Sequence, residues 1–157
     1  MIRRATTADT TGILLCLGAA FQEFRGDYTP QGFADTVLAP ATIERRLREM
    51  TVLVAEEGGI VGTIACARNG KEGHLRGMAV LPVWRGRGVA EKLLAAAEAE
   101  LAGCTRVTLD TTAPLKRAIR FYEKHGYRRT GRVTDFFGMP LYEYEKKLGT
   151  GSTPLSK

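Results

Sequence analysis

The first third of the chain is dominated by helical spacing of its hydrophobic residues. Residues 2–5 predict a short first strand. Apolar residues then recur every three or four positions over 8–24, which predicts a helix capped by Thr7. Residues 25–40 contain several glycines and prolines and predict a loop with at most one helical turn, whereas 42–50 predict a short charged helix.

The middle of the chain alternates apolar and polar residues and predicts three consecutive strands. These strands cover residues 51–56, 60–67 and 74–81. Two short glycine-containing segments, Glu57-Gly58-Gly59 and Asn69-Gly70-Lys71, separate them. Because connections of this length and composition favour hairpins, the three strands are expected to form an antiparallel meander.

The last part of the chain returns to helical spacing and then ends in strands. Apolar residues lie on one face over three turns of 89–102, which predicts a helix that Gly103 ends. A strand over 106–111 and a helix over 114–125 follow. Two final strands are expected over 127–137 and 141–147.

These elements follow the order β-α-α-β-β-β-α-β-α-β-β. The order predicts an α/β (mixed α+β) fold, with a mixed sheet of about seven strands and helices on both faces. The strand–helix–strand segment over 74–111 is expected to be a right-handed crossover between parallel strands. A chain of 157 residues has the length of one domain. We therefore expect a single domain over residues 1–148 and a loose polar tail over 149–157.

Composition excludes several classes of protein. Hydrophobic residues make up 44% and charged residues 25%, which is typical of a globular protein. The longest nearly apolar run, over 12–21, is about half of the ~20 residues that cross a bilayer. The first residues lack the pattern of a secretory signal, and the three cysteines are far apart. We therefore expect a cytoplasmic protein with buried, reduced and inert thiols, and no metal site.

The net charge of +6 favours an anionic partner, and the distribution of the charge indicates which kind. Basic residues are concentrated over 76–87 and 116–132, and there is no run of five or more lysines and arginines. This distribution favours anion-binding pockets. Neither a nucleic-acid partner nor a membrane partner is expected.

A glycine-rich turn carries the main chemical signal of the sequence. The segment Arg85-Gly86-Arg87-Gly88-Val89-Ala90 lies between a predicted strand and a predicted helix. Unpaired N–H groups at a helix start attract anions, glycines allow close approach, and arginines add donors, so the segment predicts a phosphate cradle. The P-loop pattern is absent, and Glu91 stands where a dinucleotide fingerprint needs its third glycine.

The hexapeptide resembles the acyl-CoA motif [RQ]-x-x-G-x-[GA] of the GNAT superfamily of N-acetyltransferases. A second segment, Ala118–Tyr127, resembles the pattern A-I-x-[LF]-Y-E-K-x-G-[FY] of that family, and 106–111 resembles the strand between the two. The resemblance covers about residues 50–148. It implies the GNAT fold, acetyl-CoA as co-substrate, direct acetyl transfer in a ternary complex to a primary amine of a small molecule or peptide, and a homodimer as a family habit.

The resemblance also implies which residues bind CoA. They are Met78, Ala79, Val80, Arg85, Gly86, Arg87, Gly88, Val89 and Ala90. The family strand that carries the first three diverges from its parallel neighbour, which leaves main-chain groups free to bond pantetheine and the thioester oxygen. A main-chain amide in this place acts as an oxyanion donor.

Two residues are catalytic candidates through the same resemblance. Tyr122 matches a tyrosine near the CoA sulfur that can protonate the leaving thiolate; the alternative is a tyrosine that only packs in the core. His74 stands where some members carry a glutamate base, and an imidazole pKa near 6.5 suits that role. The alternatives are a solvent-facing histidine and a water chain to Glu or Asp. Arg76, on the same strand face, is either solvated or binds an acidic acceptor.

One departure from the family pattern keeps a second function open. Leu115 occupies the position of an asparagine that often contacts pantetheine or the tyrosine. A non-catalytic acyl-CoA-binding or sensing module is therefore the alternative to an enzyme. The acceptor is expected to be chosen by the loops over 25–40 and 132–141, whose composition does not identify it.

Overall fold

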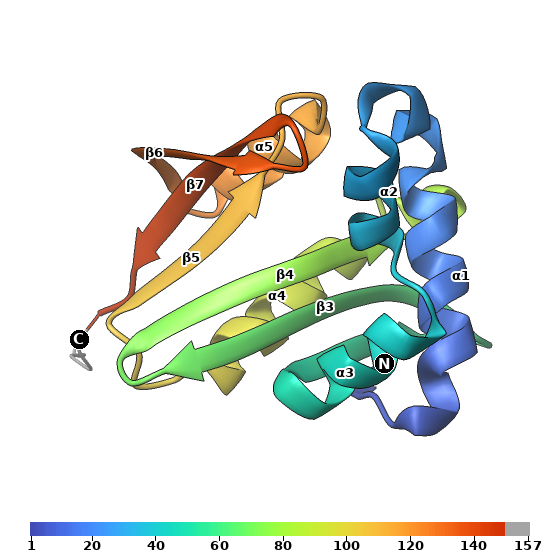
Figure 1. Cartoon of the computed structure of the whole chain (residues 1–157). Helices are drawn as coiled ribbons and strands as arrows, with labels where there is room; N and C mark the ends of the chain where they lie inside the picture. Colours follow the sequence, from blue (N-terminus) through green and yellow to red (C-terminus); the bar gives the residue numbers. More distant parts are fainter. Residues whose placement is uncertain (150–157) are drawn as a thin grey trace.

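Seven strands form one mixed sheet with helices on both faces (Figure 1). The computed structural model describes residues 1–149, so residues 150–157 of the expected tail lie outside the described part of the chain. The elements are β1 (Ile2–Arg4), α1 (Thr10–Phe21), α2 (Pro30–Val37), α3 (Pro40–Glu49), β2 (Thr51–Glu56), β3 (Ile60–Asn69), β4 (Glu72–Val80), α4 (Val89–Glu100), β5 (Arg106–Thr111), α5 (Lys116–Lys124), β6 (Arg128–Phe136) and β7 (Met139–Lys147).

The strand order across the sheet is β1-β2-β3-β4-β5-β7-β6. Strands β4 and β5 pair in parallel, and the other neighbouring pairs are antiparallel. The sequence-based expectations of a mixed sheet, a three-stranded meander and a parallel crossover through α4 are thereby confirmed. Within residues 1–149, no helix is long and apolar enough to cross a membrane.

The first helix is shorter than its apolar spacing predicts. A 3-10 turn over Thr7–Asp9 precedes α1, and a second 3-10 segment over Gln22–Asp27 follows it. The expected cap at Thr7 is wrong by one residue: the Thr6 hydroxyl accepts the N–H of Ala8 at 3.3 Å, and the Asp9 carboxylate accepts the N–H of Thr6 at 2.8 Å. This reciprocal capping box fixes the start of the turn at Thr6.

The segment expected as a loop over 25–40 contains a two-turn helix, α2. Thr29 caps it by accepting the N–H of Gly32 at 3.1 Å, and Pro30 occupies the first helical turn. Proline is favoured there because its ring already has the helical φ and its missing N–H would have no helical partner. A proline also begins α3, at Pro40, so this helix starts two residues before the expected 42–50. Thr42 was the cap expected from the sequence; it lies inside the helix, where its hydroxyl accepts the N–H of Ala39, the N-cap residue, at 2.8 Å.

The two faces of the sheet are covered by different helices, and each face has its own core. Adjacent residues of one strand point to opposite faces. Leu53 packs in the core under α4 and α5, whereas its neighbour Val54 packs in the core under α1, α2 and α3. Figure 1 shows α4 behind the sheet and α3 in front of it.

Strands β4 and β5 separate halfway along their length. Their pairing covers only Glu72–Leu75 opposite Arg106–Leu109, after which β5 continues in its pairing with β7. On the other edge of β4, the register with β3 shifts near Gly77, which has a φ of +64°. This β-bulge bends β4 away, because an extra residue in one strand increases its local twist. Figure 1 shows the two strands diverging into a fork.

The packing of α4 on the sheet predicts that Gly62→Ala is destabilising. A Cβ at Gly62 would lie 2.9 Å from side-chain atoms of both Leu93 and Val89, and 3.2 Å from the Ala79 carbonyl. We expect a loss of about 1–3 kcal/mol, because overpacking displaces well-packed neighbours. The melting temperature should fall by roughly 2–10 °C in thermal unfolding.

Gly18→Ala is the matched control for that substitution. Gly18 lies inside α1, and a Cβ there would meet no atom within 4 Å. Alanine at an unobstructed helical position should stabilise by about 0.5–1 kcal/mol. A melting temperature that changes equally in both variants would contradict the packing argument.

Candidate active site

A cavity of about 420 Å³ lies in the fork between β4 and β5. Residues of β4 from Leu75 to Val80 and of β5 and its end from Leu109 to Thr112 form the two arms. The start of α4, the helix α5 and residues of α1, α2 and α3 complete the wall. The break in strand pairing therefore opens a cavity instead of a continuous sheet.

Main-chain groups of β4 face this cavity. The N–H of Leu81 donates to the carbonyl of Val61 at 2.8 Å, and Ala79 pairs with Thr63. Alternate residues of an antiparallel strand bond the same neighbour, so the main-chain groups of Met78 and Val80 point to the other edge. No β5 residue pairs with β4 at that level, and both residues line the cavity. A main-chain N–H placed in this way suits a developing oxyanion.

The glycine-rich turn forms a second wall of the cavity. Gly86 and Gly88 have left-handed φ values of +76° and +82°, and a Cβ on either would meet no atom within 4 Å. Gly88 is the N-cap of α4 and supplies no side-chain cap, so the first N–H groups of the helix have no intrahelical partner. Together with Val89 and Ala90, both glycines line the cavity. This geometry is that of an anion cradle at a helix start.

The two arginines of the motif are engaged by the protein itself. Arg85 lines the cavity, but its guanidinium donates to the Ala20 carbonyl at 3.2 Å and pairs with Glu23 at 2.9 Å. Arg87 lies over the Trp84 ring at 4.7 Å and is not part of the cavity wall. Arg85 thus ties the turn to the end of α1.

Tyr122 lines the cavity from α5 and is only 7% exposed. Its ring packs edge-on against Phe121 and Tyr127, with centroids 5.4 Å and 5.7 Å away. Its hydroxyl makes no hydrogen bond to any residue in 1–149. Burial raises the pKa of this hydroxyl above its ordinary value, so the phenol stays protonated at neutral pH. Both the core-packing interpretation and a role for the hydroxyl agree with this position.

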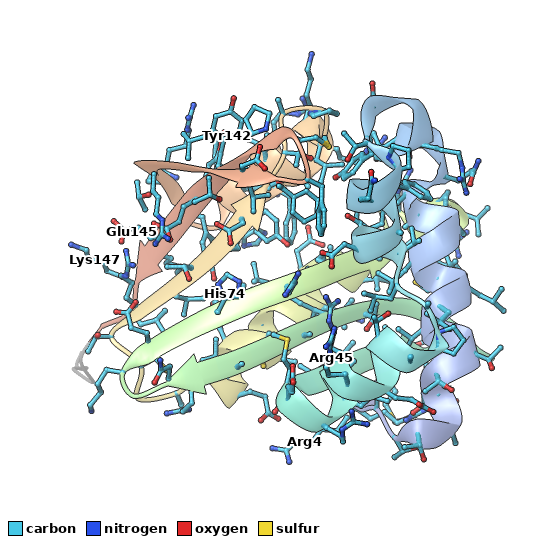
Figure 2. The ribbon with its side chains drawn as sticks, in the orientation of Figure 1. Arg4, Arg45, His74, Tyr142, Glu145 and Lys147 are labelled. Carbon is cyan, nitrogen blue, oxygen red and sulfur yellow. The ribbon has the colours of Figure 1, made fainter. Side chains whose placement is uncertain are left out.

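His74 lies outside the cavity wall, on the face of β4 that also carries α3 (Figure 2). Its Nδ1 is 2.9 Å from the Thr108 hydroxyl, and its Nε2 is 3.8 Å from the Asp110 carboxylate. Burial lowers the pKa of His74, and the nearby charge of Asp110 opposes that shift. Asp110 does line the cavity, so it connects His74 to that space.

Sequence analysis missed Asp110 and Arg46, two charged residues of the cavity wall. Strand alternation within 106–111 places Asp110 on the same face of β5 as Thr108, and this alternation was the signal in the sequence that could have identified Asp110. Arg46 follows the buried Ile43 by three positions and so shares its helix face. In residues 1–149 no group of three or more His, Cys, Asp or Glu side chains could hold a metal ion.

The fork, the helix start and the buried tyrosine surround one cavity, and comparison with known proteins shows the family in which this arrangement occurs here. The model of the Acetyltransferase (GNAT) family matches residues 18–127. The chain therefore belongs to the GNAT acetyltransferase family, as the motifs predict.

Two curated relatives and one solved structure illustrate the family. The chain is 30% identical over 106 residues to the N-alpha-acetyltransferase MAK3 of Arabidopsis thaliana, a match covering 64% of this chain and 56% of that protein. It is 31% identical over 143 residues to the aminoalkylphosphonate N-acetyltransferase of Salmonella typhimurium, covering 82% and 85%. The PaiA N-acetyltransferase of Thermoplasma acidophilum, solved in complex with coenzyme A, superposes on this chain with a TM-score of 0.78 and is 17% identical to it. The match covers 94% of this chain and 98% of that protein. Family and neighbour together indicate a CoA-type substrate.

The surroundings of His74 predict an imidazole that titrates below 6.5. Asp110→Asn should lower the pKa of His74 further, because it removes the charge that opposes burial. Below pH ~6.5, His74 binds more protons in the unfolded protein than in the folded protein. The free energy of unfolding is therefore unaffected by His74 above pH ~6.5 and decreases as the pH drops below that value.

Proton NMR titration measures the pKa of His74 in the wild type and in Asp110→Asn. The His74 resonance is identified by its absence from the spectrum of His74→Gln. His74→Gln should also weaken the loss of stability in mild acid. A His74 pKa above 6.5 in the wild type would contradict the assigned surroundings.

Proposed function

We propose that this protein is an acetyl-CoA-dependent N-acetyltransferase that moves the acetyl group directly to a primary amine in a ternary complex. The observation that carries the proposal is the fork: unpaired main-chain groups of β4, the start of α4 and Tyr122 surround one cavity. Membership of the GNAT family supports it.

In this proposal, the turn and the β4 main chain hold acetyl-CoA. The N–H groups at Gly86, Gly88, Val89 and Ala90 bind the pyrophosphate, because a helix start offers unpaired donors and positive potential. Arg85 and Arg87 add positive charge beside the cradle. Met78 and Val80 bond the pantetheine and the thioester, and Ala79 between them keeps the strand in register with β3.

The transfer needs one bond to form and one to break. The neutral amine nitrogen attacks the thioester carbon, and the N–C bond forms as the C–S bond breaks. A β4 N–H near Met78 binds the oxygen that gains charge in between. Tyr122 donates its proton to the leaving sulfur. Burial raises the pKa of the phenol, and the same burial disfavours an ionised thiolate beside it, so the sulfur needs that proton.

The proton of the amine leaves toward Asp110 and His74. Asp110 is the carboxylate of the β5 arm of the cavity, and His74 lies behind it at 3.8 Å. Burial favours the neutral imidazole, which can accept a proton. We propose His74 as a base that acts through Asp110 or an intervening water, because its ring does not reach the cavity wall.

Thermal unfolding with acetyl-CoA tests the cradle, with ATP and NADH as controls. Acetyl-CoA at about 100 times its Kd should add about 2.7 kcal/mol and raise the melting temperature by several degrees. An equal rise with ATP or NADH, or none with acetyl-CoA, would contradict the proposal. Thiol release that needs an amine distinguishes the enzyme from a non-catalytic acyl-CoA-binding module, which would bind without turnover.

Tyr122→Phe should lower kcat by about 100-fold, the usual effect of losing a general acid, and leave acetyl-CoA binding intact. Stability should hardly change, because the hydroxyl has no hydrogen bond to lose within residues 1–149. The measurements are thiol-release kinetics and thermal unfolding.

Tyr127→Phe is the matched control, because the two rings are in contact. The Tyr127 hydroxyl donates to Glu98 at 2.7 Å, away from the proposed chemistry. This variant should lose about 1–3 kcal/mol of stability and keep its kcat. An unchanged kcat in Tyr122→Phe would remove Tyr122 from the mechanism.

A further inference from the structure

Arg46 is an arginine without a partner in the wall of the cavity. It is half-buried on α3, and it makes no hydrogen bond or ion pair with any residue in 1–149. The part-buried Arg3 differs: it is paired with the carboxylates of Asp9 and Glu56 at 2.8 Å each. A guanidinium taken partly out of water is costly unless an anion compensates it.

The helix places this charge on its inner face. Ile43, three residues before Arg46, is fully buried in the core, and Leu47, four residues after Ile43, packs against the same core. Residues at these spacings share one face of a helix. Arg45 and Arg48 are exposed instead. Arg46 therefore occupies a position where packing alone would favour an apolar side chain.

The bulge in β4 makes room for the guanidinium. A Cβ at Gly77 would lie only 2.5 Å from Nη1 of Arg46, so the guanidinium lies directly over this glycine. Gly77 lies two residues beyond Leu75, the last residue of β4 that pairs with β5. The charge of Arg46 thus lies beside β4, just before Met78, where the thioester is proposed to bind.

A second arginine lies near the first, and the one carboxylate beside them is paired with the second. Arg76 pairs with Asp35 of α2 at 3.2 Å. Burial, and after it the charge of Arg76, lowers the pKa of Arg46 to about 10, and the charge of Asp35 only partly offsets them. Arg46 is still charged at neutral pH. The pair therefore has one positive charge more than the protein neutralises locally.

The opposite arm of the fork has the opposite charge. Asp110 lines the cavity from β5, and its carboxylate makes no hydrogen bond with residues 1–149 beyond its approach to His74 at 3.8 Å. On the side of β4 the cavity thus has the guanidinium groups of Arg46 and Arg76, one of them paired with Asp35, and on the side of β5 it has the carboxylate of Asp110. A ligand with an anionic end and an ammonium end matches both.

We propose that Arg46, with Arg76, binds the acid group of a small amino-acid-like acceptor whose amine lies at Asp110. This inference rests on the proposed function and specifies its substrate class: a primary amine a few bonds from a carboxylate or phosphonate. The fork geometry of a guanidinium suits both acids, since each offers two oxygens to its N–H groups.

Isothermal titration of the protein saturated with CoA tests this assignment through binding alone. The probes are β-alanine and 2-aminoethylphosphonate, with n-propylamine lacking the acid and propionate lacking the amine. Both zwitterions should bind at least about 10-fold tighter than either single-charge probe, and the better zwitterion tells which acid the site prefers.

Arg46→Gln should weaken zwitterion binding by about 10- to 100-fold and leave acetyl-CoA binding unchanged. Arg46→Lys should lose less zwitterion affinity, because lysine keeps the positive charge but lacks the paired N–H groups of the guanidinium. Arg45→Gln, one residue away on the exposed face, is the matched control and should bind as the wild type does. The melting temperature of ligand-free Arg46→Gln should stay equal or rise, because an uncompensated charge has been removed.

Several outcomes would overturn the proposal. They are equal binding of zwitterions and n-propylamine, no binding of either zwitterion, a zwitterion affinity that Arg46→Gln leaves unchanged, and a loss of acetyl-CoA affinity in that variant. A lower melting temperature with unchanged binding would assign Arg46 a packing role instead. Failure of the wild type to bind acetyl-CoA would count against the proposed function, and the two failures are therefore distinguishable.

Discussion

The loss of main-chain pairing between β4 and β5 after Leu75 and Leu109 is the constraint on which the rest of the structure depends. Polar main-chain groups in a protein interior are almost always paired, so two strands of one sheet separate only where another partner can be accommodated. The bulge at Gly77 causes the divergence, and β7 keeps β5 in place by pairing with it through Thr111. The unpaired edge of β4 consequently faces a cavity.

The helices and the glycine-rich turn are arranged around the fork. The turn after β4 starts α4 at the mouth of the cavity, and Arg85 ties this turn to the end of α1. The two cores fix the helices independently, α4 and α5 on one face and α1 to α3 on the other. Tyr122 therefore approaches the cavity from one face of the sheet, and Arg46 approaches it from the other. In the proposed function, the two substrates meet at the fork.

Sequence reasoning succeeded where the signal was local. Glycines at 86 and 88 predicted a tight turn between a strand and a helix, and both adopt left-handed backbone at the start of α4. The phosphate cradle at this turn stays a prediction. The helix over 30–37 was missed because the prolines and glycines in and around it, Gly26, Pro30, Gly32 and Pro40, were taken as loop signals, although Pro30 after Thr29 is a helix start. His74 was expected at the site, but it lies outside the cavity wall, with its Nε2 3.8 Å from the carboxylate of Asp110.

The sequence by itself determined most of the elements, the family and the glycine-rich turn before α4, because periodicity, glycine placement and motif spacing depend on neighbours along the chain. Tertiary structure decided which side chains share the cavity. Arg46 and Asp110 are 64 positions apart and carry no motif. They line one cavity because β4 and β5 diverge and the guanidinium of Arg46, on α3, lies over the bulge at Gly77. Whether a charge is paired depends on the atoms that folding brings near it, and this information is not present in any local pattern.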